Sequence, residues 1–157
     1  MLTFGKTKID GDNALNSLAN SLISMKPTLR VFELYVQKTK ATEASLAAVS
    51  AALAKHKLLE ELALNFGHTL QGSDKGLFQL AETIVDLHHL SKFHIVVFGK
   101  INITKDGLDR IVDAIEKNEE VKEIQCRIQS TQLKDNQIKD VVKKLETLIS
   151  DRSHLDF

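Results

Sequence analysis

The side chains that could perform chemistry in this sequence are one cysteine, six histidines and a short loop that contains glycine. Cys126 alternates with Ile124 and Ile128, which predicts that it points into the core and behaves as a small apolar residue. His88 and His89 are adjacent, so on a helix they would face about 100° apart and could not share a metal ion. Their position at the end of a predicted helix favours a role in complementing the helix dipole.

His94 differs from these residues, because we expect it on the exposed side of a strand, beside Lys92. No pattern of carboxylate and serine accompanies it that would define a catalytic base. The stretch GSDKG at residues 72–76 lacks the spacing and the terminal serine or threonine of a phosphate-binding loop, and we interpret it as a loop followed by a helix cap. The sequence therefore predicts no enzymatic activity, no catalytic residues, no metal site and no cofactor.

The elements that would position these side chains recur along the whole chain. Strand-like alternation of apolar residues occurs at 2–4, 32–36, 62–66, 93–97, 124–128 and 155–157, in steps of 30 or 31 residues. Between these segments lie helical stripes with apolar residues at i, i+3 and i+7, beginning at Leu15, Leu46, Leu77, Leu108 and Ile138. Because two independent patterns share one period, the sequence predicts a solenoid.

One more apolar residue precedes each strand, at Leu29, Leu59, Leu90 and Val121, so that the unit reads L-x-x-L-x-L, then a loop, then a helix. This unit resembles the leucine-rich repeat family, specifically the long, helix-bearing repeats of the ribonuclease-inhibitor type. The turn KNEEVKEIQ is also loosely similar to the repeat domain of the tropomodulin group. The resemblance covers residues 1–157 and implies one α/β solenoid domain of about five repeats, with a parallel β-sheet on the concave side and helices on the convex side.

Helix starts agree with this arrangement. A residue whose side-chain oxygen could cap the first turn stands three or four positions before each stripe, at Asp12, Thr42, Ser73, Thr104 and Asp135. The sequence departs from the family at the end of the strands, where many such repeats carry an asparagine. The corresponding positions here are Lys38, His68, Gly99 and Ser130.

Composition narrows the class of partner. Lysine plus arginine equals aspartate plus glutamate, 21 each, so no overall field attracts the chain to nucleic acid or to an anionic membrane. No apolar run is long enough for a membrane span, and the N-terminal residues do not resemble a signal peptide. A single cysteine excludes an internal disulfide framework and suits a reducing compartment, so we expect a cytoplasmic protein.

The outward positions of the four central strands are the predicted binding surface for another protein. If the residues at 32, 34 and 36 and their equivalents point inward, the outward set is Val31, Glu33, Tyr35, Glu61, Ala63, Asn65, Lys92, His94, Val96, Glu123, Gln125 and Arg127. The first half of this set is acidic with Tyr35 as an aromatic anchor, and the second half is more basic. A partner with the reverse polarity would suit it, which predicts a non-catalytic protein–protein interaction scaffold.

Three alternatives stay open at this point. Relatives of this repeat class include GTPase activators that act through an arginine on a loop after a strand, but the loops at 6–12, 37–43, 67–74, 98–104 and 129–135 contain no arginine. A nuclease inhibitor and a cytoskeletal filament-capping module are the other two. Because strand-like segments stand at both ends, we also expect either a fragment of a longer repeat array or a subunit that pairs with others in a larger assembly.

Overall fold

The fold was taken from a computed structural model, which describes residues 2–4, 11–36, 41–66, 74–99, 102–130 and 133–153. Strands and helices alternate strictly along these residues. In order they are β1 (Leu2–Phe4), α1 (Gly11–Ser24), β2 (Val31–Tyr35), α2 (Glu43–Leu53), β3 (Glu61–Asn65), α3 (Lys75–Asp86), β4 (Lys92–Gly99), α4 (Lys105–Lys117), β5 (Glu123–Ser130) and α5 (Asp135–Ser153). The strand predicted at 155–157 lies outside the described residues.

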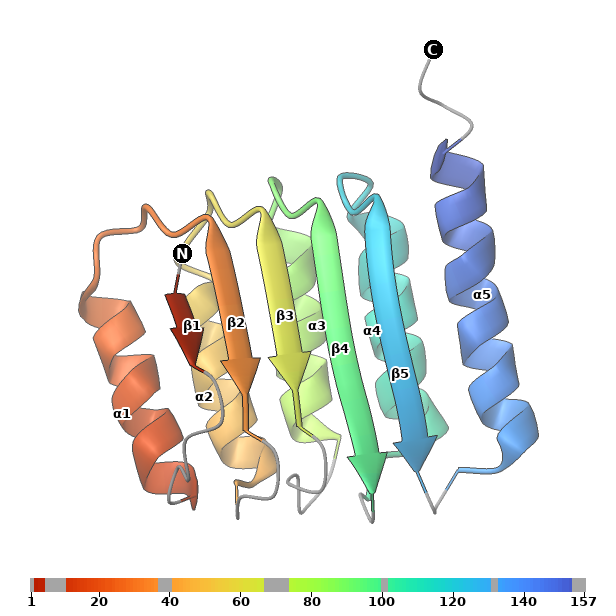
Figure 1. Cartoon of the computed structure of the whole chain (residues 1–157), viewed down its shortest axis with the longest axis horizontal. Coiled ribbons are helices and arrows are strands. Elements are labelled where there is room, and N and C mark those ends of the chain that lie inside the picture. Colours follow the sequence, from red (N-terminus) through yellow and green to blue (C-terminus); the bar gives the residue numbers. More distant parts are fainter. Residues whose placement is uncertain are drawn as a thin grey trace.

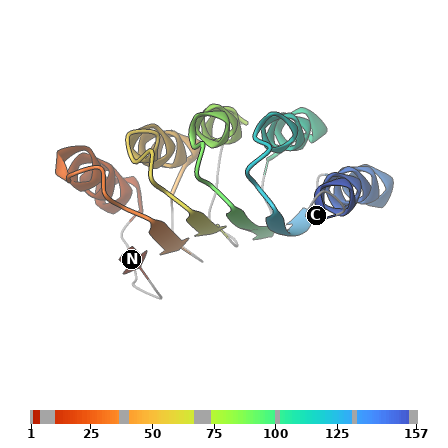
Figure 2. The ribbon, with the colours of Figure 1, turned by 90° about the horizontal axis from the view of Figure 1, so that it is seen from above.

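The strands form one parallel sheet whose spatial order, β1-β2-β3-β4-β5, is the order of the chain. Helices α1 to α4 each return the chain to the start of the next strand, so every unit packs on the one before it (Figure 1). Seen from above, the helices form the outer arc and the strands line the inner side (Figure 2). The predicted fold class is therefore confirmed: an α/β solenoid with a parallel sheet on its concave side.

The core lies between the sheet and the helices, and equivalent residues of successive repeats stack in it. Leu34 pairs with Leu64, Leu64 with Ile95, and Ile95 with Cys126 across the strands. The first three side chains are at most 2% exposed. The apolar residues that precede the strands, Leu29, Leu59, Leu90 and Val121, are also buried, as predicted.

The last repeat is less closely packed than the others. Helix α5 stands farther from α4 than α4 does from α3 (Figures 1 and 2). As a result Ile124 and Cys126 are only partly buried, although Cys126 packs against the core as the alternation predicts. Even so, burial raises the pKa of the Cys126 thiol to about 11, so the thiolate is scarce near neutral pH and the side chain acts as an apolar residue.

Two of the residues predicted as helix caps, Thr42 and Thr104, have a different role from the one expected. Thr42 and Thr104 do precede α2 and α4, but neither side chain bonds to its own helix. Asp12 lies inside α1, Asp135 is the first residue of α5, and Asp74 is the residue before α3. Ser73 lies outside the described residues.

Instead, each of these threonines bonds to an aspartate of the preceding repeat, which we call an Asp–Thr joint. The Thr42 amide donates to Asp12 Oδ1 at 2.7 Å and its hydroxyl donates to the same carboxylate at 3.0 Å. The Thr104 amide and hydroxyl donate to Asp74 in the same way, the amide at 2.9 Å. Burial alone would raise the pKa of Asp12, but the hydrogen bonds from Thr42 and Ser45 outweigh it and hold the pKa below its ordinary value.

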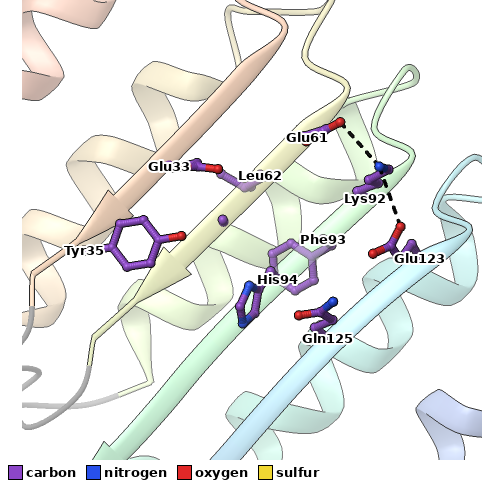
Figure 3. A pocket seen from close by; sticks show the side chains of 10 residues that line it. Glu33, Tyr35, Glu61, Leu62, Lys92, Phe93, His94, Glu123 and Gln125 are labelled. Atoms are coloured by element: carbon purple, nitrogen blue, oxygen red, sulfur yellow. Dashed lines mark ion pairs between the residues drawn. The ribbon is translucent and has the colours of Figure 1, made fainter. Parts of the chain in front are cut away.

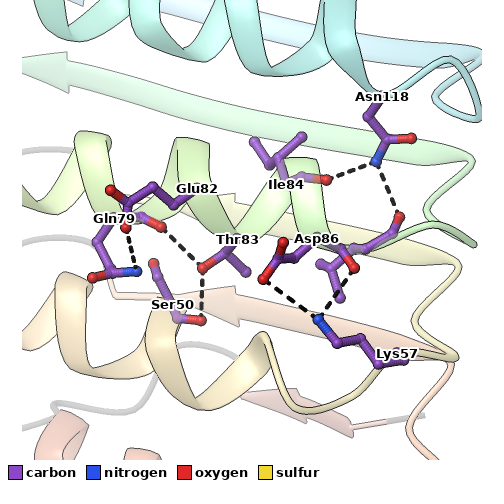
Figure 4. A network of polar contacts seen from close by, with 9 residues as sticks. Ser50, Lys57, Gln79, Glu82, Thr83, Ile84, Asp86 and Asn118 are labelled. Atoms are coloured by element: carbon purple, nitrogen blue, oxygen red, sulfur yellow. Dashed lines mark hydrogen bonds and ion pairs between the residues drawn. The ribbon is translucent and has the colours of Figure 1, made fainter.

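Buried polar side chains also join neighbouring helices near their C-terminal ends. The Asn118 amide donates to the carbonyl oxygens of Ile84 and Leu87 at 2.7 and 3.0 Å (Figure 4). His56 Nε2 lies 3.0 Å from the carbonyl oxygen of Leu22, so this nitrogen carries the proton. Each of these carbonyl oxygens also accepts a backbone N–H group, so the side chains add a second hydrogen bond that joins two repeats.

Helix α5 is attached by charged groups in addition to its buried residues Val141 and Leu145. Lys105 and Lys144 each contact both Asp109 and Asp140 at 2.6–3.7 Å, which forms a network of four charges across α4 and α5. Near the other end of α5, the Arg152 guanidinium donates to the carbonyl oxygens of Val121, Ile115 and Glu116 at 2.6–3.1 Å. None of the helices in the described residues is long and apolar enough to cross a membrane.

Candidate functional site

The concave face of the sheet carries the predicted binding residues as three rows that run across strands β2 to β5. Strand pairing places the residues of each row directly opposite one another on neighbouring strands. The rows are Val31, Glu61, Lys92 and Glu123; then Glu33, Ala63, His94 and Gln125; then Tyr35, Asn65, Val96 and Arg127. Because adjacent strands lie about 4.8 Å apart, the rows form one continuous surface.

Most of these side chains reach solvent. Lys92, Glu123, Gln125 and Arg127 are exposed, while Val31, Glu33, Tyr35, Glu61, Ala63, Asn65 and His94 are half-buried. Val96 is the exception, because it is only 8% exposed and lies between the longer side chains of Asn65 and Arg127. The expectation that Val96 would be an exposed contact residue is therefore wrong.

The charges on this face are partly paired. Lys92 Nζ lies 3.6 Å from Glu61 Oε1 and 3.7 Å from Glu123 Oε2, so it bridges the strands on either side of its own (Figure 3). All three side chains are about half exposed, so solvent screens these pairs and each adds little stability. The concave face is therefore less clearly divided into an acidic and a more basic half than predicted. Lys92 pairs with Glu61 of the first half and with Glu123 of the second half.

A shallow hollow of about 190 Å³ lies in the middle of the face. Its lining comprises Glu33, Tyr35, Glu61, Leu62, Ala63, Lys92, Phe93, His94, Glu123 and Gln125. The hollow exists because Ala63, the smallest residue of the three rows, lies in register between Glu33 and His94. Tyr35 and His94 flank it from β2 and β4 (Figure 3).

The dimensions and chemistry of the hollow suit a protein side chain better than a cofactor. Sites for small molecules usually enclose about 300–1,000 Å³, which is more than this hollow of about 190 Å³ offers. Among the described residues, no group of three or more histidine, cysteine, aspartate or glutamate side chains could hold a metal ion. The carboxylates, the phenol and the imidazole can instead take part in hydrogen bonds and ion pairs with a partner.

A second surface depression, which the sequence did not reveal, lies on the convex side between α3 and α4. It measures about 220 Å³, and its apolar lining residues are Phe78, Ala81, Val85 and Ala114. The Arg110 guanidinium lies 5.5 Å from the centre of the Phe78 ring, within range of a cation–π contact. Phe78 lies one position after the helical stripe residue Leu77, and this extra apolar residue was the signal that could have found the depression.

Solved structures that resemble this fold include the following two. Leiomodin-1 actin-binding site 2 matches with a TM-score of 0.68 and 12% identity, over 98% of this chain and 80% of that chain. The fold of the present chain is leucine-rich-repeat-like. The tropomodulin C-terminal domain of Caenorhabditis elegans matches with a TM-score of 0.51 and 14% identity, over 89% of this chain and 93% of that chain. The looser of the two resemblances, to tropomodulin, is thus supported at the level of fold, and the ribonuclease-inhibitor type stays a prediction.

No family model matches the sequence, and a search of curated proteins found no match. At 12–14% identity the two structures share a fold with this chain, and residue roles do not transfer from them. The concave face itself is therefore the main evidence for the function of this chain.

Proposed function

We propose that this chain is a non-catalytic protein-binding module whose concave face binds its partner. The observation that carries the proposal is the open face of the sheet, on which Glu33, Tyr35 and His94 line a hollow. A sheet face that packed inside the molecule would be apolar, as the opposite face of the same strands is. Charged, aromatic and amide groups on one curved surface are typical of a recognition site.

Actin is the partner to test first, which makes the module a cytoskeletal one and implies a cytoplasmic location. Support comes from the likeness in fold to leiomodin-1 actin-binding site 2, which extends over 98% of this chain. A likeness to the tropomodulin C-terminal domain points the same way and keeps the filament-capping hypothesis open. The alternative of a GTPase activator or nuclease inhibitor rests on loops that lie largely outside the described residues.

Co-sedimentation of the purified chain with actin filaments tests this proposal. A Tyr35→Ala variant should bind more weakly by at least about 1 kcal/mol, or about fivefold in Kd, because aromatic anchors contribute strongly to interfaces. Lys143→Ala is the matched control, since Lys143 is exposed on α5 and away from the sheet. Filament elongation measured with labelled actin would then show whether binding caps an end.

Absence of any binding to filaments or monomers would exclude actin as the partner. Binding that is lost in Lys143→Ala but kept in Tyr35→Ala would instead show that the convex side carries the interaction, and the concave assignment would be abandoned.

A further inference from the structure

The last strand of the described sheet, β5, has one edge that no described strand covers. It pairs with β4 on one side, and the spatial order of the sheet ends with it. Helix α5 follows β5 without leading into another strand of the described chain. This helix has 19 residues, whereas α4 has 13, and its last turns stand above the level at which the other helices end (Figure 1). Within the described residues, β5 therefore presents an open edge.

Hydrogen bonds between the earlier strands identify the backbone groups on this edge. A core-facing residue directs its N–H group to the following strand, as the Phe66 amide does to the Val96 carbonyl oxygen at 2.9 Å. A residue on the concave side directs its N–H group back to the preceding strand, as Glu123 does to the Ser91 carbonyl oxygen at 3.0 Å. The N–H and C=O groups that β5 presents on its open edge are therefore those of its core-facing residues. These residues are Ile124, Cys126 and Ile128.

The core beside this edge is less well covered than in the inner repeats. Ile124 and Cys126 are only partly buried, and α5 stands away from the sheet beside them (Figure 2). The equivalent residues of β4, Phe93 and Ile95, have a strand on both sides and are at most 2% exposed. A further strand beside β5 would bury Ile124 and Cys126 more completely, and the burial of their apolar surface would stabilise it.

The concave side of the same edge carries Gln125 and Arg127, and both side chains are exposed. Lys92 on β4 contacts two carboxylates, whereas Arg127 has no ion pair with any described residue. Side chains that lie opposite each other on neighbouring strands are about 5 Å apart, so a carboxylate on an added strand could pair with this guanidinium. The charge of Arg127 thus favours an acidic strand over a basic one.

We propose that β5 binds an extended segment of a partner protein, which adds to the sheet as a sixth strand. The segment has apolar residues at alternate positions, which cover Ile124 and Cys126, and an acidic residue on the side of Arg127. In this mode of recognition, main-chain hydrogen bonds give affinity and the side chains at alternate positions give specificity. The inference goes beyond the proposed function, because it requires neither the hollow at Ala63 nor actin.

Amide hydrogen exchange of the full chain, followed by nuclear magnetic resonance, tests whether the edge is open. In the free chain the amides of Ile124, Cys126 and Ile128 should exchange at least about tenfold faster than those of Gln125 and Arg127, which are directed to β4. Slow exchange of the first three amides would overturn the inference. The edge would then be covered by residues of the same chain or, if the protection depends on protein concentration, by a second copy.

A synthetic peptide then tests binding. The probe is a capped peptide of about seven residues, a usual strand length, in which valine alternates with threonine and aspartate replaces the central threonine. The matched ligand has the same side chains but carries N-methyl groups on the backbone nitrogens that would donate to β5. The first peptide should slow exchange at Ile124, Cys126 and Ile128 by at least about tenfold at saturation, and the second should not.

Two arginine variants test the recognition of the acidic residue. Arg127→Gln should weaken binding of the aspartate peptide about two- to fivefold, as expected for an exposed ion pair. Arg110→Gln is the matched control on the convex side and should have no effect. Unchanged affinity in Arg127→Gln would overturn the assignment of an acidic residue to the segment.

Equal binding of the two peptides, or chemical shift changes centred on the hollow or on α3 and α4, would overturn the inference as a whole. Tyr35→Ala separates this inference from the proposed function, because it should weaken binding to filaments and leave peptide binding unchanged. If the peptide binds to β5 and actin does not bind, the inference stands and the proposed partner is wrong. If filaments bind through Tyr35 and the peptide does not bind, only the inference about β5 fails.

Discussion

The inner repeats and the last repeat follow the same sequence pattern but are stabilised by different forces. In the inner repeats, Leu34, Leu64 and Ile95 are fully buried, and buried side chains such as Asn118 join adjacent helices. In the last repeat, Cys126 at the equivalent position is partly exposed, and α5 is attached by exposed ion pairs and by Arg152. The comparison shows that a repeat period fixes where a helix lies without fixing how tightly it is attached.

The difference follows from the residues available at each boundary. Among the described helices, α2, α3 and α4 each pack between two other helices, and the residues of their helical stripes are almost entirely apolar. Helix α1 packs on α2 alone. Helix α5 packs on α4 alone among the described helices, and of its stripe only Val141 and Leu145 are buried. Because α5 buries less apolar surface than the inner helices, ion pairs contribute a larger share of its attachment, and solvent screens these ion pairs.

The largest expected effect is on the core of the inner repeats. Leu64→Ala should lower the free energy of unfolding by about 2–5 kcal/mol, because it removes buried methyl groups and leaves a cavity. Cys126→Ala removes less, about 1 kcal/mol or below, since the side chain is smaller and partly exposed. Urea unfolding of both variants measures the difference.

Glu61→Ala is the control for the core variant and should change the free energy of unfolding by no more than about 0.5 kcal/mol. Equal losses at Leu64 and Glu61 would mean that the strand faces are assigned the wrong way round.

A smaller difference is expected between the buried and the exposed polar joints. Asn118 is 4% exposed, so Asn118→Ala removes two buried hydrogen bonds, and the carbonyl groups of Ile84 and Leu87 keep only their backbone donors. The expected loss is about 1–3 kcal/mol. Arg152→Ala should cost less, because Arg152 is itself partly exposed to water whereas Asn118 is buried. Thermal melts of the two variants decide the order, and a larger loss at Arg152 would contradict the view that α5 is the more weakly attached helix.

The smallest effect is expected at the ion network between α4 and α5, and it should depend on pH and salt. Hydrogen bonds from Lys105 and Lys144 outweigh burial and hold the pKa of Asp109 below its ordinary value of 3.8, and the contact with Lys105 lowers the pKa of Asp140. Both carboxylates therefore stabilise the fold above about pH 4, and this contribution is lost as the pH falls through their folded pKa values. The contact with Asp109 raises the pKa of Lys105 above 10.5, so its contribution is present below that pH and disappears as the pH rises past its folded value.

Removing one member of the network tests this behaviour. Lys144→Gln should lower the melting temperature slightly at pH 7 in low salt, and the difference from the unchanged protein should shrink in high salt. The same difference should also shrink below pH 4, where the aspartates become protonated. A difference that is independent of both salt and pH would show that Lys144 acts through its aliphatic chain.

The sequence predicted the elements and the faces of the sheet because both depend on local periodicity. Phe32 and Leu34 alternate with Glu33, and this period of two assigns each side chain to a face whatever the partner strand is. The same alternation placed Tyr35 and His94 on the concave side, where the structure has them. The hollow at Ala63 could not be predicted, since it depends on side chains from three neighbouring strands.

The sequence did not predict the Asp–Thr joints, for a related reason. Asp12 and Thr42 were each interpreted as the cap of their own helix, because that is the nearest backbone in the sequence. The structure shows that the closest partner lies in the adjacent repeat, 30 residues away. Val96 was similarly predicted as an outward contact residue, and it lies in the outward row but is only 8% exposed. A comparison of the sequence with itself at twice the repeat period would have revealed that Asp12 and Thr42 recur as Asp74 and Thr104.

The spacing of the Asp–Thr joints sets the size of the piece by which this solenoid can be shortened or extended. Each joint links one helix to the next, from α1 to α2 and again from α3 to α4. Deleting the α2 repeat would place Asp12 beside Asp74, and deleting the α3 repeat would place Thr42 beside Thr104. Deleting or duplicating two repeats together keeps an aspartate opposite a threonine at every joint. Arrays engineered from this chain should therefore grow in steps of two strands and two helices.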